Sequence, residues 1–171
     1  MSKIVEFTKS YQNEVVKHIL DIQNNELRLG LSLEDQPDLL SIEENYQKTG
    51  GNFWIAIDHD KVVGTIGLYN LGQNTGDLRK MFVKPDYRGP ELGTSKSLLN
   101  ILIKWTIDNN FENIFLETNS AFKAAIKFYH KNGFKKVEKR QLPPNFPIMK
   151  VAESFFVYEI KQNLQNIMAI E

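Results

Sequence analysis

The chain has 171 residues, 42% of them apolar and 25% charged, and this size and composition indicate one folded domain with a core of its own. Its 21 lysine and arginine residues equal its 21 aspartate and glutamate residues, so the net charge favours a small-molecule or protein partner over nucleic acid or an anionic membrane. The absence of cysteine excludes disulfides, thiolate catalysis and cysteine-ligated metal centres.

The first third of the chain predicts a strand followed by two helices. Residues 3–8 are typical of a short strand, and Ser10 is expected to cap a helix whose apolar residues recur at helical spacing. A polar stretch broken by Pro37 follows, and residues 39–47 predict a second helix that ends at a pair of glycines.

The middle of the chain predicts a hairpin and then a strand, a loop and a helix. The runs 53–57 and 62–69, rich in aromatic and β-branched residues, are the expected hairpin strands. After a loop at 72–76, residues 78–83 predict a strand, which a glycine-containing loop at 87–93 connects to a helix. That helix carries apolar residues on one face, Leu98, Ile101, Leu102 and Trp105.

The last third predicts another strand, a helix and two closing strands. A right-handed crossover should make the strand at 113–117 the parallel neighbour of the preceding strand. The helix at 120–131 is expected to end in a left-handed cap at the Asn-Gly pair that follows it. The runs 134–140 and 154–160 predict an antiparallel pair joined by a proline-rich loop.

Together these elements predict an α/β fold in which one domain, residues 1–160, contains a mixed twisted sheet of about six to seven strands flanked by about four helices. The tail at 161–171 carries four apolar residues, Leu164, Ile167, Met168 and Ile170. A helix this short is marginal alone, so we expect it to dock on its own domain or on a second subunit. A homodimer is the preferred alternative, and a frayed end on a monomer is the other.

Targeting signals and metal-binding patterns are both missing from the sequence. No stretch approaches the ~20 apolar residues of a membrane span, and residues 1–10 lack the apolar core of a signal peptide. We therefore expect a cytoplasmic protein without membrane contact. The histidines, His18, His59 and His130, fall on separate elements without the spacing of metal ligands, so no metal site is predicted.

Residues 88–95 carry the most informative chemistry, because they stand where a strand passes into a helix. The N–H groups at a helix start lack intrahelical partners, and the helix dipole adds partial positive charge, so a phosphate or pyrophosphate binds there favourably. Gly89 and Gly93 allow the backbone to approach such an anion closely. A connector without a ligand is the alternative, since neither a Walker A motif nor a complete dinucleotide-binding fingerprint is present.

The run MFVKPDYRG at 81–89 resembles the strand and acetyl-CoA loop of the GNAT acetyltransferase superfamily, whose loop pattern is R/Q-x-x-G-x-G/A. Arg88 takes the first place of that pattern and Gly93 the last, while Glu91 stands where the family usually has its middle glycine. Because a carboxylate repels a pyrophosphate and Pro90 has no N–H to donate, we expect Glu91 to point to solvent.

A second segment, AIKFYHKNGF at 125–134, is similar to the family segment A-x-x-[LF]-Y-x-K-x-G-F. The family often has an asparagine three residues before that alanine, where this chain has Phe122. The corresponding contact with pantetheine is therefore either missing or supplied by Asn119. Three further segments are similar to a bacterial subgroup of the superfamily, at residues 33–39, 78–83 and 146–149.

The resemblance implies an N-acetyltransferase that uses acetyl-CoA as its co-substrate, bound between the two parallel strands. An amine then attacks the thioester directly, without a covalent acyl-enzyme. The residues expected to contact the donor are those of the strand backbone and the loop, together with the asparagine above: Met81, Phe82, Val83, Arg88, Gly89, Glu91, Leu92, Gly93, Thr94, Ser95 and Asn119.

The resemblance nominates Tyr129 as the general acid that protonates the departing CoA thiolate, and a core aromatic is the alternative interpretation. Its reference pKa of ~10 lies near that of a thiol, ~8.5, which suits proton transfer. An amine acceptor must also lose a proton, and Asp77 and Glu117 are the carboxylates expected nearest the two strands. A loop residue and a solvated strand end are their alternatives. Arg79 and Lys80 should point to opposite faces of their strand, as charged surface residues.

The acceptor is expected to be a primary amine of a small molecule or peptide. A polyamine, an amino acid, an antibiotic amine and a protein N-terminus all remain open. Two other classes of function fit the same fold, a CoA-binding module without turnover and an interaction protein that binds no CoA. A thermal shift with CoA separates the last of these from the others.

Overall fold

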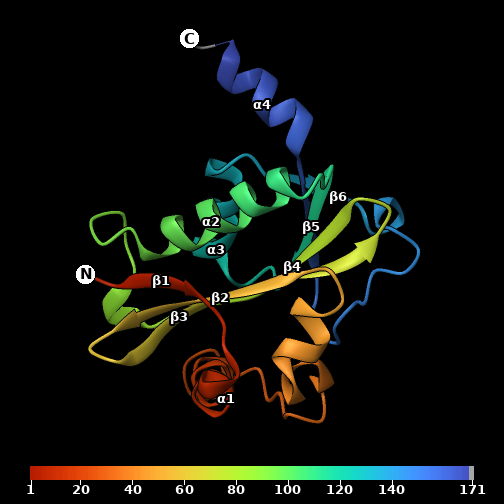
Figure 1. Cartoon of the computed structure of the whole chain (residues 1–171). Helices are drawn as coiled ribbons and strands as arrows, with labels where there is room; N and C mark the ends of the chain where they lie inside the picture. Colours follow the sequence, from red (N-terminus) through yellow and green to blue (C-terminus); the bar gives the residue numbers. More distant parts are fainter. Residues whose placement is uncertain (170–171) are drawn as a thin grey trace. The chain divides into compact units, whose positions relative to one another are not determined.

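The computed structural model describes residues 1–169 of the chain (Figure 1). These residues form two compact units: unit 1 comprises Met1–Tyr69 and Arg79–Trp105, and unit 2 comprises Asn70–Leu78 and the chain from Thr106 onward. Within the described residues the strands make a seven-stranded mixed sheet in the order β1-β2-β3-β4-β5-β7-β6, flanked by helices. The predicted fold class is confirmed, while the division at residue 160 stays a prediction.

Unit 1 contains most of the first half of the chain. Its strands and longer helices are β1 (Lys3–Glu6), α1 (Gln12–Asp21), β2 (Asn52–Asp58), most of β3 (Lys61–Gly72), the second half of β4 (Thr75–Val83) and most of α2 (Thr94–Asp108). Five short helical segments complete it, η1 (Lys9–Tyr11), η2 (Ile22–Glu26), η3 (Pro37–Leu40), η4 (Glu43–Gln47) and η5 (Pro85–Tyr87).

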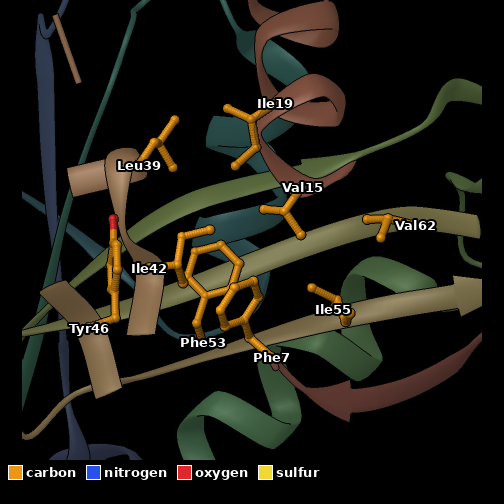
Figure 2. Packing of buried hydrophobic residues seen from close by; sticks show 9 residues of the cluster. All are labelled: Phe7, Val15, Ile19, Leu39, Ile42, Tyr46, Phe53, Ile55 and Val62. Carbon is orange, nitrogen blue, oxygen red and sulfur yellow. The ribbon is translucent and has the colours of Figure 1, made fainter. Parts of the chain in front are cut away.

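The core of unit 1 follows from the two-residue period of β2, which pairs antiparallel with β1 and β3. Phe53 and Ile55 point to the face covered by α1 and η4, where they join an apolar cluster with Val15 and Tyr46 (Figure 2). Trp54 points to the other face and packs edge-on against Trp105 of α2, with 5.8 Å between ring centroids. Both faces of β2 are therefore buried, as its continuous apolar run requires.

Two tight turns place the strands, and the second differs from the prediction. His59 and Asp60 both have positive φ between β2 and β3, which confirms the expected hairpin. Gln73 and Asn74 adopt the same left-handed conformation, so a two-residue turn replaces the loop expected at 72–76. Strand β4 therefore begins at Thr75, three residues earlier than expected.

The expected second helix is broken, and Ser10 is not a cap. Residues Lys9–Tyr11 form a 3₁₀ turn, and α1 begins at Gln12 without a side-chain cap. Ser41 is extended between η3 and η4. The Gln12 side chain binds the backbone on both sides of this break, donating to the Leu39 carbonyl at 2.6 Å and accepting from the Ile42 N–H at 3.1 Å. These bonds satisfy the Leu39 carbonyl and the Ile42 N–H, backbone groups that would be hydrogen-bonded within the helix if it were continuous.

Unit 2 contains β5 (Asn113–Thr118), α3 (Lys123–Lys131), β6 (Lys135–Val137), η6 (Lys139–Gln141), β7 (Ser154–Glu159) and α4 (Ile160–Met168). Strand β4 pairs parallel with β5 from Thr75 to Asp77, which confirms the predicted parallel neighbours. Strand β7 lies between β5 and β6 and pairs antiparallel with both. Of the expected cap residues only Gly133 has positive φ.

The C-terminal tail is helical, as α4, and its apolar side chains remain exposed. Leu164, Ile167 and Met168 are 39%, 54% and 74% exposed, so docking of this face on the same chain is not observed among the described residues. Ile170 lies outside them. Between residues 1 and 169 no helix is both long enough and apolar enough to cross a membrane.

Candidate functional site

A glycine loop, residues 88–93, joins η5 to α2 in unit 1. Gly89 and Gly93 have φ values of 99° and 66°, and an added Cβ at either glycine would meet no atom within 4 Å. The Gly93 N–H donates to the Gly89 carbonyl at 3.1 Å and closes the turn. The loop therefore turns sharply beside open space, which is the shape that an anion-binding backbone requires.

The start of α2 follows directly on this loop. The Ser97 N–H donates to the Gly93 carbonyl at 2.9 Å, so the N–H groups of the preceding turn are those that a helix leaves without intrahelical partners. Thr94 is buried, and its hydroxyl lies 3.1 Å from that of Ser2 in a hydrogen bond. The Glu91 side chain is exposed, as the sequence predicts.

Arg88 is held by a residue that the sequence patterns did not nominate. Its two terminal nitrogens donate to the carboxylate oxygens of Glu26 at 2.5 and 2.8 Å, and its Nε donates to the Val83 carbonyl at 2.7 Å. The neighbouring Tyr87 hydroxyl donates to Asp58 at 2.8 Å, and this bond is the main cause that lowers the pKa of that carboxyl. Glu26 stands 62 positions before Arg88, so no local motif could reveal the pair.

A buried histidine contacts the strand expected to align the donor. Nε2 of His18 lies 3.0 Å from the Phe82 carbonyl, and since a carbonyl only accepts, Nε2 carries the proton. Burial, aided by the Lys84 charge, lowers the pKa of His18. Its role in unit 1 is therefore to fix the backbone of β4 from α1.

Arg79 and Lys80 do not point to opposite faces of β4, so that expectation is wrong. Lys80 has a φ of 56°, which interrupts the extended backbone and breaks the alternation. Both side chains consequently reach Asp38, with nitrogen–oxygen distances of 4.0 Å for Arg79 and 3.5 Å for Lys80. The Tyr46 hydroxyl donates to the same carboxylate at 2.5 Å.

A buried polar network surrounds this charged cluster. Gln23 and Gln36 exchange two amide hydrogen bonds of 2.8 Å, and Lys80 Nζ donates to the Gln36 oxygen at 2.7 Å. Burial raises the pKa of Asp38, but Lys80, Arg79 and Tyr46 together outweigh this effect and lower it. Two of the subgroup segments identified in the sequence, 33–39 and 78–83, thus meet through their charged residues.

Tyr129, the expected general acid, lies in α3 and is packed among the aromatic side chains of unit 2. Its ring makes contacts with Phe128, Phe134 and Phe156 at centroid distances of 5.7, 5.5 and 6.4 Å. The side chain is 8% exposed, and burial raises the pKa of its hydroxyl well above the ordinary value. The hydroxyl is therefore protonated throughout the physiological range, but the raised pKa moves it away from that of a thiol and makes it a weaker acid than an exposed tyrosine.

The other nominated residues of unit 2 have structural contacts. Both carboxylate oxygens of Glu117 accept from the Met149 N–H at 3.1 Å, which ties the connection between β6 and β7 to the end of β5. The Asn119 amide donates to the Val151 carbonyl and accepts from the Ala121 N–H. Asp77 is completely buried inside β4 and is not the loop residue considered as its alternative role.

The nominated residues divide between the two units. The residues of β4 and the glycine loop that are expected to contact the donor, Met81 to Ser95, belong to unit 1. Tyr129, Glu117, Asn119 and Asp77 belong to unit 2. Among residues 1–169 no group of three or more histidine, aspartate or glutamate side chains is arranged to hold a metal ion.

Comparisons with known proteins identify relatives of the chain. Residues 16–134 match the model of the acetyltransferase (GNAT) family. A crystal structure described as an acetyltransferase of the GNAT family, from Staphylococcus aureus MU50, is 40% identical with a TM-score of 0.90 and covers 94% of this chain and 99% of its own. An acetyltransferase from Streptococcus agalactiae 2603 is 29% identical with a TM-score of 0.87, over 92% and 98% of the two chains.

A curated relative is the N-acetylaspartate synthetase of Danio rerio, 35% identical over 102 residues. This alignment covers 58% of the present chain and 36% of the relative. The chain therefore spans only about a third of that protein, and it spans under half of the Mus musculus protein named "Probable N-acetyltransferase family 8 member 5", which it also matches.

Proposed function

The chain belongs to the GNAT acetyltransferase family, and on that premise we propose that it transfers an acetyl group from acetyl-CoA to a primary amine. The observation that carries the proposal is the glycine loop between β4 and α2, with open space where Gly89 and Gly93 lack side chains. The loop backbone and the first turn of α2 would receive the pyrophosphate of the donor. The proposal keeps the cytoplasmic location expected from the sequence.

The pantetheine arm would be aligned by the backbone of Met81, Phe82 and Val83, whose geometry His18 supports through the Phe82 carbonyl. An N–H of this strand would stabilise the negative charge that develops on the acetyl oxygen. Positioning of the two substrates supplies much of the rate enhancement in such a direct transfer. Ternary-complex kinetics are expected, and a trapped acetyl-enzyme would contradict this mechanism.

The chemical step forms one bond and breaks another. The amine nitrogen attacks the acetyl carbon, the carbon–sulfur bond breaks, and the thiolate takes the proton of the Tyr129 hydroxyl. The attacking amine loses its proton to a base, for which Glu117 and Asp77 remain our candidates, directly or through water. Both oxygens of Glu117 already accept a hydrogen bond from the Met149 N–H. If Glu117 is the base, the proton of the amine would bind to a lone pair that this hydrogen bond does not use.

The acceptor is proposed to be an amine of a small molecule or peptide. The name of the Danio rerio relative makes amino acids the first acceptors to test, followed by polyamines, antibiotic amines and peptide N-termini. The decisive experiment follows CoA release from acetyl-CoA across this panel of amines. No turnover with any of them, together with measurable CoA binding, would favour a CoA-binding module, which Glu91 in the place of a loop glycine also favours.

We predict that Gly93→Glu weakens CoA binding at least about tenfold, because a side chain and a negative charge would enter the open space of the loop. Isothermal titration calorimetry with CoA measures the effect. Any side chain placed at Gly93 is also strained by the positive φ of this position. Gly93→Ala introduces this strain without the charge, so its CoA affinity measures the contribution of strain alone.

Gly72→Glu is the matched control for this prediction, since Gly72 also has positive φ and open space around its Cβ but lies in a turn of unit 2. It should retain wild-type affinity for CoA. Equal affinities of Gly93→Glu and Gly72→Glu would remove the glycine loop from the proposed site.

A homodimer formed through α4 remains part of the proposal, motivated by the exposed Leu164, Ile167 and Met168. Light scattering after size exclusion should show a dimer for the full chain and a monomer for a chain ending at Ile160. A monomer in both cases would reject the dimer, and a dimer in both would show that α4 is not its cause.

A further inference from the structure

We infer that Glu26 is a positioning residue for the donor site, holding Arg88 so that the glycine loop keeps the shape that receives the pyrophosphate. The inference rests on the proposed function. It assigns a role to η2, a segment that no motif connects with the loop. Arg88 stands at the first place of the loop motif, and its guanidinium faces a carboxylate of the protein itself.

The geometry is that of the strongest arginine contact. Both terminal nitrogens of Arg88 bind the two oxygens of Glu26, a bidentate arrangement that fixes orientation as well as distance. The remaining Nε donates to the Val83 carbonyl at 2.7 Å. One side chain therefore joins η2, the end of β4 and the beginning of the glycine loop.

The loop needs such an anchor because the residue after Arg88 is a glycine, which does little to restrict its own backbone conformation. Gly89, with a φ of 99°, follows Arg88 directly and has more accessible backbone conformations than any other residue type. Tyr87, bonded to Asp58, fixes the residue before Arg88, and Ser2, bonded to Thr94, fixes the residue after the loop. The Glu26 contact completes the restraint at the point where the backbone turns.

An opposing interpretation makes a clear and opposite prediction. If Arg88 left Glu26 to bind the pyrophosphate itself, Glu26 would compete with the donor for the guanidinium. Removing the carboxylate would then tighten CoA binding, and the loss of a negative charge near an anionic ligand would act in the same direction. Only a positioning role makes Glu26→Gln bind CoA more weakly, so the sign of the change decides between the two.

The test measures the dissociation constant of CoA for the full chain by isothermal titration calorimetry. Glu26→Gln should weaken CoA binding about two- to fivefold, the upper part of the range found for arginine–carboxylate pairs at partly exposed positions. Glu44→Gln removes the same charge from an exposed ion pair with Lys48 and should leave the constant unchanged. Pantetheine, which lacks the pyrophosphate, should bind Glu26→Gln and the wild type equally.

A double-mutant cycle tests whether Glu26 acts through Arg88. Adding Glu26→Gln to Arg88→Met should cause no further loss of CoA affinity, because Glu26 has no guanidinium to hold once Arg88 has been replaced. Wild-type or tighter CoA binding by Glu26→Gln, or an equal loss for pantetheine, would overturn the inference while leaving the proposed function intact. Wild-type protein that binds no CoA would instead overturn both.

Discussion

Tyr129→Phe is expected to lower kcat by about 100-fold or more, while the KM for acetyl-CoA changes little. The substitution removes the proton that the departing thiolate would take, and the phenylalanine ring keeps the contacts with Phe128, Phe134 and Phe156. Initial-rate kinetics with an amine identified from the acceptor panel provide the measurement. A fall in kcat with an unchanged KM is the signature of a group that acts in the transition state.

Tyr158→Phe is the matched control, because Tyr158 is another buried tyrosine of unit 2, packed against Phe134 with 5.2 Å between centroids. It should retain nearly wild-type kcat. The pH profile adds a second test: burial raises the pKa of Tyr129, so its hydroxyl should cause no alkaline loss of kcat up to about pH 10. Wild-type turnover of Tyr129→Phe would make this residue a core aromatic only.

Asp38→Asn is expected to destabilise the protein by about 3 kcal/mol, since it removes a buried carboxylate that both Arg79 and Lys80 reach. The side chains of Asp38 and Lys80 are only 10% and 2% exposed, so water cannot replace the lost charge effectively. Urea denaturation at neutral pH measures the change in the free energy of unfolding. Glu44→Gln, on the surface, should change it by less than about 1 kcal/mol.

The same cluster gives the stability a defined pH dependence. The pKa of Asp38 is lower in the folded state than in the unfolded chain, so the unfolded state binds the proton more readily. Its contribution is fully present above the unfolded pKa of ~3.9 and disappears as the pH falls through the folded pKa. The difference between wild type and Asp38→Asn should therefore shrink below about pH 4, and a pH-independent difference would contradict the electrostatic origin.

Local patterns in the sequence correctly predicted the parts of the fold that depend on residues close together along the chain. The period of β2 and β3 and the turn at His59 and Asp60 gave the hairpin correctly. The crossover rule gave the parallel pairing of β4 with β5. Where a distant side chain intervened, as Gln12 does at the break around Ser41, helical periodicity predicted a continuous helix that does not form.

The candidate site divides in the same way. The glycine loop and Tyr129 could be nominated because each lies inside a contiguous motif. Glu26 and Asp38 could not, because each acquires its charged partners from a segment far away in the sequence. The direction of Lys80 was also mispredicted, since a non-glycine residue with positive φ in a strand leaves no signature in the sequence.

By itself, then, the sequence determined most of the elements, the family resemblance and the position of the glycine loop, because hydrophobic period, turn chemistry and contiguous motifs act between neighbours along the chain. Only the tertiary structure decided which charges meet. Long-range ion pairs such as Glu26 with Arg88 and Asp38 with Lys80 depend on where the folding of unit 1 places the glycine loop relative to η2 and β4 relative to η3. A charged residue looks alike in the sequence whether it faces solvent or a partner, and packing alone separates the two.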